Sequence, residues 1–322
     1  MKNVELLSTG KYLPKKIVTN NDLEKIVDTS DEWIQQRTGI KQRRISQTEN
    51  TSDLAAKAAQ QAIMRANIDV RKIDLIIVST MTPDSNMPST ACIVQNKIGA
   101  DNAFCFDVSA ACSGFVYALT TAEKIIRHGN YNCALVIASE VNSKYIDWSD
   151  RASCVLFGDG AGAVVIKGND QGREDFLNEK LESYGEYNGA LSSGITEPEI
   201  ELKDKEYIKS SFLKMDGQAV FNFTITKVPN SINSMMEELD EDIDVVIAHQ
   251  ANIRIIKLIA KRTGIDENNF FVNLQKYGNT SSASVAIALD EYISNRKNNS
   301  RENILLSAFG GGLTIGNVLI RK

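Results

Sequence analysis

The chain has few of the residues that build metal sites and disulfide frameworks. Its five cysteines are odd in number and no two have the Cys-x-x-Cys spacing, and it has only two histidines, His128 and His249. This argues against a disulfide framework and a zinc site, and it predicts a reducing compartment. No window approaches the roughly 18 apolar residues of a membrane helix. The first residues also lack the apolar core of a signal peptide. We therefore expect a cytoplasmic protein that holds no metal.

A large excess of charge is also absent. The net charge is −5 over 322 residues, with 43% hydrophobic and 24% charged residues, which is typical of an ordinary globular protein. This charge gives no general attraction to nucleic acid or to an anionic membrane, so we expect neither as a partner. An acidic partner would have to bind a local basic patch. The length allows about two domains or one duplicated core.

Patterns of buried strands and of helices alternate along the chain, and the same order occurs twice. Apolar runs typical of strands covered by helices occupy Ile73–Thr80, Phe104–Val108, Cys133–Ser139, Ile243–His249, Phe270–Asn273 and Asn303–Ala308. A duplicated α/β unit is the economical explanation. We predict two similar halves, residues 1–170 and 171–322. Residues 171–211 are rich in charge and turn formers, and we interpret them as a connecting insertion with marginal structure.

One stretch of the first half changes from a strand pattern to a helix pattern at a cysteine, Cys112. A helix N-terminus offers unpaired N–H groups and the positive end of the helix dipole. Both favour a thiolate, so a cysteine there can be a nucleophile near neutral pH. The alternative is a small buried cysteine at a tight turn. Small neighbours leave room for a substrate carbonyl: Ala110, Ala111, Ser113 and Gly114.

Polar residues also follow two predicted strands of the second half. His249 ends one apolar run, and Asn279 follows another. Reactive groups in α/β folds gather at the carboxyl ends of strands, so we expect both near Cys112. The glycines Gly310–Gly312 follow the last such run and allow the backbone to approach a nucleophile or ligand, although a simple tight turn would also use glycine. We expect His128, in the last turn of a helix, to lie on the surface.

A glycine-rich segment, Phe157–Ala163, suggests a dinucleotide site at first sight. A dinucleotide fingerprint must open a helix, whereas this one continues as a strand pattern. We predict a close-packed β-turn instead.

Basic residues form one stripe on a predicted helix. Arg254, Lys257 and Lys261 recur at helical spacing after His249, with Arg262 beside them. Such a stripe is usually solvated surface, but its position makes it a candidate dock for an acidic partner. Trp33 and Arg37 also share a helix face, and by pattern alone we interpret them as a surface anchor.

Six motifs together resemble the thiolase superfamily, and specifically the β-ketoacyl-acyl-carrier-protein synthase III family. They are Asp31–Ile40, Ala110–Phe115, Phe157–Ala163, His249–Asn252, Gly278–Ser282 and Phe309–Gly312, and they cover nearly the whole chain. The resemblance implies a five-layered αβαβα fold with two duplicated halves, and a homodimer. It implies condensation of an acyl-CoA primer, acetyl-CoA in the simplest case, with malonyl carried on acyl carrier protein, and no cofactor. This reaction initiates fatty acid biosynthesis.

The resemblance also implies roles for individual residues. Cys112 would carry the acyl group, His249 and Asn279 would stabilise the enolate, and the backbone N–H groups of Cys112 and Gly311 would form the oxyanion hole. The implied coenzyme A contacts are Thr29, Trp33, Arg37, Arg151 and Asn252. The implied carrier-protein contacts are Arg254, Lys257 and Lys261, and the implied acyl pocket consists of Met87, Leu156 and Phe221.

Two positions depart from the family pattern. Ser113 follows the nucleophile where an alanine is common, and the change is small. Met87 stands where the family often has a phenylalanine that borders the acyl pocket of the neighbouring subunit. A flexible methionine there would admit a longer or branched primer.

Three alternatives remain at this point. The chain could be a quinolone- or polyketide-type synthase, a hydroxymethylglutaryl-CoA synthase-like enzyme, or a non-catalytic dimer partner that binds acyl carrier protein. The intact set of Cys112, His249 and Asn279 disfavours the non-catalytic partner. A degradative thiolase needs a second cysteine late in the chain, whereas the last one here is Cys154.

Overall fold

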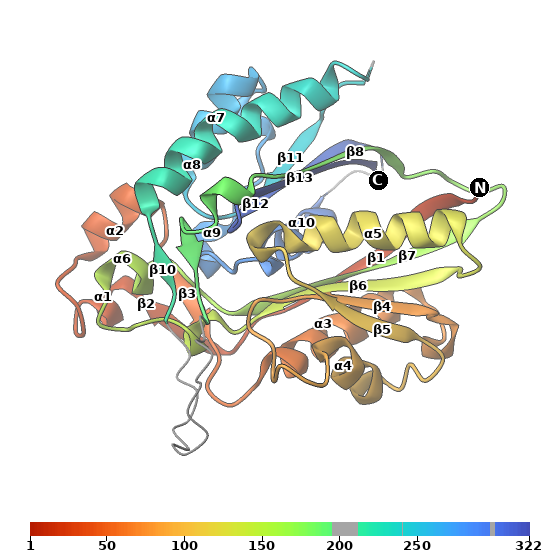
Figure 1. Ribbon diagram of the computed structural model, residues 1–322, viewed down its shortest axis with the longest axis horizontal. Coiled ribbons are helices and arrows are strands. Elements are labelled where there is room, and N and C mark those ends of the chain that lie inside the picture. Colours follow the sequence, from red (N-terminus) through yellow and green to blue (C-terminus); the bar gives the residue numbers. More distant parts are fainter. Residues whose placement is uncertain (195–211, 240, 297–299) are drawn as a thin grey trace.

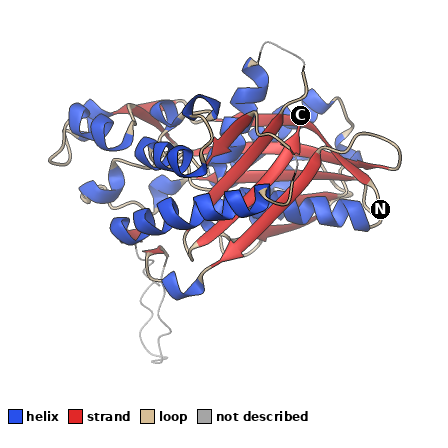
Figure 2. Ribbon diagram, turned by 90° about the horizontal axis from the view of Figure 1, so that it is seen from above, coloured by secondary structure: helices blue, strands red, loops and turns tan. Residues whose placement is uncertain are grey.

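The computed structural model describes residues 1–194, 212–239, 241–296 and 300–322. Two sheets stack with helices outside and between them, in five layers (Figure 1). Helices flank the strands on both sides when the molecule is seen from above (Figure 2). The predicted α/β fold with five layers is confirmed.

The second sheet repeats the order of four of the five strands of the first. The first runs β1 (Asn3–Tyr12), β7 (Gly160–Asn169), β6 (Cys133–Glu140), β4 (Leu75–Ser79) and β5 (Phe104–Val108). The second runs β8 (Phe176–Ser183), β13 (Thr314–Arg321), β12 (Asn303–Gly310) and β11 (Val245–Ala248). In the first sheet β4 pairs parallel with both β5 and β6, and in the second β11 pairs parallel with β12. Antiparallel strands extend both sheets on the other side. The repeated sequence pattern therefore reflects a repeated topology.

The helices occupy equivalent places in the two halves. Two helices, α5 (Gly114–His128) and α10 (Ala283–Asn295), pack between the sheets (Figure 1). The outer layers are formed by α3 (Thr51–Ala66) and α4 (Thr90–Ile98) on one side and by α7 (Gly217–Met236) and α8 (Ile253–Thr263) on the other. Every residue from Ala283 to Glu291 in α10 is buried, as expected for a helix enclosed on all sides.

Smaller elements complete the fold beside the C-terminal ends of the central strands. They are α1 (Asn20–Leu23), α2 (Asp31–Thr38), α6 (Arg151–Cys154), α9 (Leu274–Tyr277) and two small sheets, β2 (Lys16–Thr19) with β3 (Gln42–Ile45) and β9 (Leu191–Ser192) with β10 (Lys214–Met215). None of the helices in the described part of the chain has the length and hydropathy to cross a membrane.

Two sequence predictions need correction. The segment 171–211 is not merely a connecting insertion, because Phe176–Ser183 is strand β8 and pairs with β13 along the edge of the second sheet. Most residues of this strand are half-buried and three are charged, so no apolar pattern marks it in the sequence. Residues 195–211 of that segment lie outside the described residues.

The predicted strand Phe270–Asn273 is the second correction, because it makes only one bridge, between Phe270 and Val246. The backbone N–H groups of Asn273 and Leu274 instead donate to the side-chain oxygen of Gln250, at 3.0 and 3.3 Å. The Gln250 side chain therefore supplies the hydrogen-bond acceptor that a neighbouring strand would otherwise provide to this backbone.

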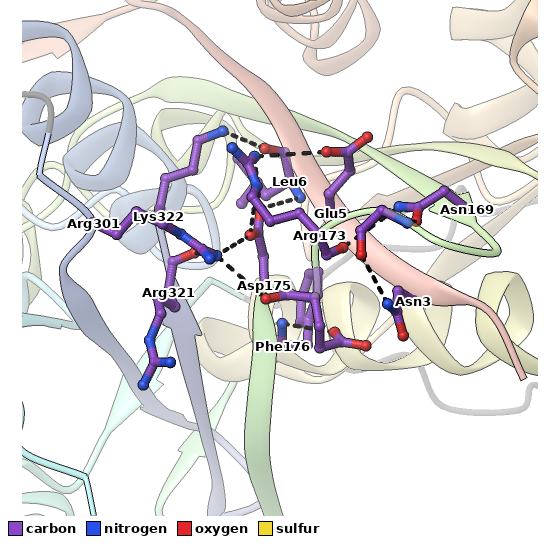
Figure 3. A network of polar contacts seen from close by, with 12 residues as sticks. Asn3, Glu5, Leu6, Asn169, Arg173, Asp175, Phe176, Arg301, Arg321 and Lys322 are labelled. Atoms are coloured by element: carbon purple, nitrogen blue, oxygen red, sulfur yellow. Dashed lines mark hydrogen bonds and ion pairs between the residues drawn. The ribbon is translucent and has the colours of Figure 1, made fainter.

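A buried carboxylate, Asp175, joins the two sheets where the chain crosses between them. It accepts hydrogen bonds from the Leu6 backbone at 3.0 Å, from Arg173 at 3.0 Å and from Arg301 at 2.5 Å, and a second nitrogen of Arg173 forms an ion pair with it at 2.9 Å. Lys322 adds a further link by donating to the Leu6 carbonyl at 2.5 Å (Figure 3). This network ties β1 to the C-terminal strand.

We expect Asp175→Ala to lower the free energy of unfolding by about 2–4 kcal/mol, because the Leu6 N–H would lose its buried acceptor and two guanidinium groups their counter-ion. Both arginines are about 40% exposed and can regain water, which keeps the loss below that of a fully buried pair. Urea denaturation measures the effect. Asp170→Ala, an exposed carboxylate on the same connection, is the control, and equal losses in both variants would contradict the role of the network.

Candidate active site

Cys112 lies in the turn between β5 and α5. One turn of 3-10 helix, Ala111–Ser113, connects the strand to the helix. Ala111 has a φ of 47°, a left-handed conformation that costs a non-glycine residue roughly 1–3 kcal/mol. Such strain persists only where the surroundings enforce it, and here it accompanies the reversal of the chain at Cys112. Cys112 is 6% exposed and lines two cavities, so it lies where they meet.

The glycine turn after β12 packs directly on the backbone of Cys112. A methyl group at Gly310 would overlap the backbone nitrogen of Cys112, and at Gly311 it would lie 3.5 Å from the Ala111 side chain. The close approach of the two backbones therefore requires glycine at position 310. A simple tight turn between two strands would not impose this requirement. It brings the predicted oxyanion-hole residues Cys112 and Gly311 to one place.

His249 follows β11 and is 2% exposed. Its Nδ1 lies 2.6 Å from the hydroxyl of Ser284, at the start of α10, and its ring meets Phe309 edge-on at 5.1 Å. Burial lowers the pKa of His249 to about 3, because an apolar surrounding disfavours the charged form. The imidazole is therefore neutral at physiological pH.

Asn279 is held by its backbone against the segment that lines the cavity. Its N–H donates to Leu156 at 2.9 Å, and its carbonyl accepts from Gly158 at 3.0 Å. Its side-chain oxygen accepts from the Ser281 backbone at 2.8 Å. This bond fixes the carboxamide so that its oxygen is engaged and its NH₂ group is left to donate to a ligand.

The structure brings the predicted catalytic residues together. Cys112, His249 and Asn279 all line the smaller cavity, of about 210 Å³. The pKa of the Cys112 thiol is raised to about 12, chiefly by burial, with a smaller upward contribution from Glu140; the Ser281 hydroxyl, 3.5 Å from the sulfur, acts in the opposite direction. Burial therefore opposes the thiolate that the helix terminus favours.

The predicted acyl-pocket residues do not line the larger cavity. Leu156 and Phe221 line the smaller cavity with His249 and Asn279, whereas Met87 is 86% exposed and lines neither. The larger cavity, of about 540 Å³, begins at Cys112 and is lined on its far side by Met81, Val108, Asn142, Tyr145 and Leu213. Sequence reasoning missed these five because they come from separate strand ends and loops and share no pattern.

The residues predicted to hold coenzyme A gather around α2. Two guanidinium groups lie near the Trp33 ring, that of Arg37 at 5.7 Å and that of Arg151 at 5.1 Å from its centroid. The Thr29 hydroxyl is buried without a partner among the described residues. Asn252 donates to the Arg37 carbonyl at 3.0 Å and also lines the smaller cavity. Asn252 therefore links α2 to the lining of that cavity.

Arg43, which the sequence did not single out, connects the segment that lines the smaller cavity to α2. Arg43 is fully buried and donates to the Val155 carbonyl at 2.6 Å and to the Asn20 side chain at 2.8 Å. Asn20 in turn donates to Asp31 of α2 at 2.8 Å. Burial lowers the pKa of Arg43 to about 10, so it stays charged. Nothing in the sequence distinguishes Arg43 from its neighbour Arg44.

The predicted basic stripe lies on the exposed side of α8. Arg254, Lys257 and Lys261 are exposed, whereas Ile255, Ile256, Ile259 and Ala260 face the core. Lys257 pairs with Glu267 at 2.9 Å. The helix begins at its cap Asn252, which lines the smaller cavity, so the basic face starts at the cavity entrance. The described residues contain no cluster of His, Cys, Asp and Glu suited to a metal ion.

The two stacked sheets, with a cysteine, a histidine and an asparagine at their strand ends, define a thiolase-fold acyltransferase. Two models of the 3-oxoacyl-[acyl-carrier-protein] synthase III family match the chain, one over residues 106–185 and the C-terminal one over residues 237–322. The chain belongs to the β-ketoacyl-acyl-carrier-protein synthase III family.

Individual relatives agree over their full lengths. The β-ketoacyl-[acyl-carrier-protein] synthase III of Clostridium acetobutylicum is 50% identical, covering 100% of this chain and 99% of that protein. That of Streptococcus mutans is 50% identical over 96% of both. The crystal structure of 3-oxoacyl-[acyl-carrier-protein] synthase III from Aquifex aeolicus superposes with a TM-score of 0.91 at 42% identity, covering 99% of this chain and 100% of the other. The three alternative functions are not favoured by these similarities.

Proposed function

We propose that this enzyme condenses an acyl-CoA primer, acetyl-CoA in the simplest case, with malonyl-acyl-carrier protein and so starts fatty acid synthesis. The product is a 3-oxoacyl-acyl-carrier protein, and Cys112 carries the acyl group between the two steps. One observation carries the proposal: Cys112 lies at the junction of two cavities, and only the smaller one contains His249 and Asn279. The larger cavity can take the acyl chain while the smaller one admits the thioester arms.

In the first step the Cys112 sulfur attacks the thioester carbonyl of acyl-CoA. The bond to the coenzyme sulfur breaks, and the proton of the Cys112 thiol ends on the departing sulfur, so no external acid or base is consumed. Two backbone N–H groups, those of Cys112 and Gly311, stabilise the oxyanion. Such a donor contributes roughly 3–4 kcal/mol in other enzymes. A sulfur nucleophile attacks a thioester without a metal or redox cofactor, and we propose that the enzyme uses none.

In the second step the malonyl carboxylate leaves as CO₂ and its electron pair forms an enolate. The enolate oxygen accepts hydrogen bonds from His249 and from the Asn279 amide. Its carbon attacks the acyl-Cys112 carbonyl, and Cys112 leaves as a thiolate that takes one proton from solvent. The low pKa of His249, about 3, supports this role, because a neutral imidazole can donate one hydrogen bond without titrating during turnover.

We further propose that the enzyme is a homodimer and that its edge strand β5 forms the contact. On its free side β5 has no partner among the described strands, and Phe104 on it is 38% exposed. Met87, at 86% exposure, would then reach the larger cavity of the second subunit. Coenzyme A would be bound by Thr29, Trp33, Arg37, Arg151 and Asn252. Acyl carrier protein would dock on the basic residues of α8, which are Arg254, Lys257 and Lys261.

Mass spectrometry of the intact enzyme after exposure to a panel of acyl-CoAs tests the proposal and identifies the primer. We expect one acyl group per chain with at least one acyl-CoA of the panel, and release of that group when malonyl-acyl-carrier protein is added. A chain that remains unlabelled across straight, branched and longer acyl-CoAs would contradict the proposal.

Reversing the charge of Arg254 should impair the use of the carrier protein alone. We expect Arg254→Glu to lower kcat/KM for malonyl-acyl-carrier protein about tenfold at low salt, because it places a negative charge where an acidic partner docks. Self-acylation by acyl-CoA should stay within twofold of the wild type. Lys72→Glu, the same change at an exposed site before β4, is the control. Equal losses of both half-reactions in Arg254→Glu would refute the docking role.

A further inference from the structure

The hydroxyl of Ser284 occupies a position between His249 and the backbone that follows it. Its oxygen lies 2.6 Å from Nδ1 of His249 and accepts a longer hydrogen bond, of 3.4 Å, from the Gln250 backbone N–H. Ser284 and His249 are each 2% exposed. Within the described part of the chain the imidazole makes no other hydrogen bond, so its Nε2 is left to the cavity that His249 lines.

A neutral imidazole has two tautomers, and only one of them satisfies every group at this position. With the proton on Nε2, the Ser284 hydroxyl donates to Nδ1 and its oxygen accepts from Gln250. With the proton on Nδ1, the Ser284 oxygen would face two donors. The hydroxyl hydrogen would then have no acceptor among the described residues, because the bond to Nδ1 is the only one in which Ser284 can donate. A buried donor without an acceptor costs roughly 1–3 kcal/mol.

We propose that Ser284 is a positioning residue that fixes the Nε2–H tautomer of His249. The consequence is chemical, because Nε2 then carries a proton and can only donate to a ligand in the cavity. That is the requirement for stabilising an enolate oxygen, whereas the other tautomer would present a lone pair and repel it. The consequence for catalysis rests on the proposed function, while the tautomer itself does not.

The side chain of Asn279 is also oriented so that it presents a hydrogen-bond donor to the cavity. Asn279 has its oxygen engaged by the Ser281 backbone N–H, at 2.8 Å, and therefore also offers a donor. Both hydrogen bonds come from the same short segment, since Ser281 lies two residues before α10 and Ser284 lies in its first turn. The start of one helix thus sets the polarity of both groups that face the reacting oxygen.

Nitrogen NMR of the ¹⁵N-histidine-labelled wild-type enzyme tests the assignment directly. The chain has only two histidines, so His128→Ala assigns the signals of His249 without ambiguity. We expect Nε2 of His249 to give the signal of a protonated nitrogen and Nδ1 that of an unprotonated, hydrogen-bonded one between pH 6 and pH 8. A protonated Nδ1 with an unprotonated Nε2 in the wild type would overturn the proposal and needs no variant.

Kinetics of Ser284→Ala then test the consequence. We expect condensation with malonyl-acyl-carrier protein to fall about 10–100-fold, the usual effect of losing a residue that orients a functional histidine, with acylation of Cys112 by acyl-CoA within twofold of the wild type. The His249 signals should shift toward a mixture of tautomers, and Ser284→Thr, which keeps the hydroxyl, should restore both readouts. Ser294→Ala, at an exposed position on the same helix, is the control.

The outcomes separate this inference from the proposed function. Unchanged His249 signals and unchanged condensation in Ser284→Ala would overturn the role of Ser284. An Nε2-protonated wild type that condenses no acyl group would leave the tautomer assignment standing and contradict the proposed function instead.

Discussion

Cys112→Ser should carry no acyl group after exposure to any acyl-CoA that labels the wild type, and its condensing activity should fall at least about 10³-fold. The physical reason lies in the nucleophile. Burial already raises the pKa of the Cys112 thiol to about 12, and a serine hydroxyl in the same surroundings is a much weaker acid and a poorer nucleophile toward a thioester. Intact-protein mass spectrometry and a steady-state condensation assay measure the two effects.

Another cysteine provides the control for this change. Cys92 is an exposed thiol on α4, and Cys92→Ser should acylate and condense like the wild type. If Cys112→Ser still acquired the acyl mass, or if the label mapped to Cys92, Cys112 would not be the nucleophile.

Removing either donor to the enolate should separate the two half-reactions. We expect His249→Ala and Asn279→Ala each to lower the rate of condensation about 10²–10³-fold, as the loss of a hydrogen-bond donor to developing charge does in other enzymes. Acylation of Cys112 should change by only a few-fold, because its oxyanion is served by the backbone N–H groups of Cys112 and Gly311. Asn279→Asp should be at least as severe, since a carboxylate would repel the enolate.

The exposed second histidine provides the control here. His128 is exposed in the last turn of α5, at the end of the helix opposite Cys112, and His128→Ala should leave both half-reactions unchanged. Because both donors serve one oxygen, the double variant should lose less than the product of the two single effects. If acylation fell as far as condensation in both single variants, the two residues would serve the first step as well, and the assignment would be wrong.

The duplicated fold could be predicted from the sequence because its central strands are unbroken apolar runs. Ile73–Thr80 and Ile243–His249 show the same pattern and became β4 and β11, the equivalent strands of the two sheets. The edge elements could not be predicted as well. β8 carries three charged residues, Glu179, Lys180 and Glu182, among its eight. At Phe270–Asn273 the side chain of Gln250 binds the backbone where a strand was predicted. Edge strands are half exposed, so their sequences show a weaker pattern.

The site could be predicted in part for a similar reason. Cys112, His249 and Asn279 follow strands whose ends meet, so topology alone placed them near one another. The raised pKa of Cys112 could not be predicted, because the helix start was visible in the sequence whereas the depth of burial was not. Arg43, Ser284 and the lining of the larger cavity also escaped, because they act through contacts with residues more than 30 positions away.

The central claim is that the acyl group passes through Cys112 on its way to the carrier protein. A chase experiment tests it most directly: the enzyme is acylated with labelled acyl-CoA, freed of excess reagent and mixed with malonyl-acyl-carrier protein. The label on Cys112 and the labelled 3-oxoacyl product are then followed together. We predict that the label leaves Cys112 at the rate at which product forms, with one CO₂ released per acyl group. Product that forms while the label stays on Cys112 would contradict the account.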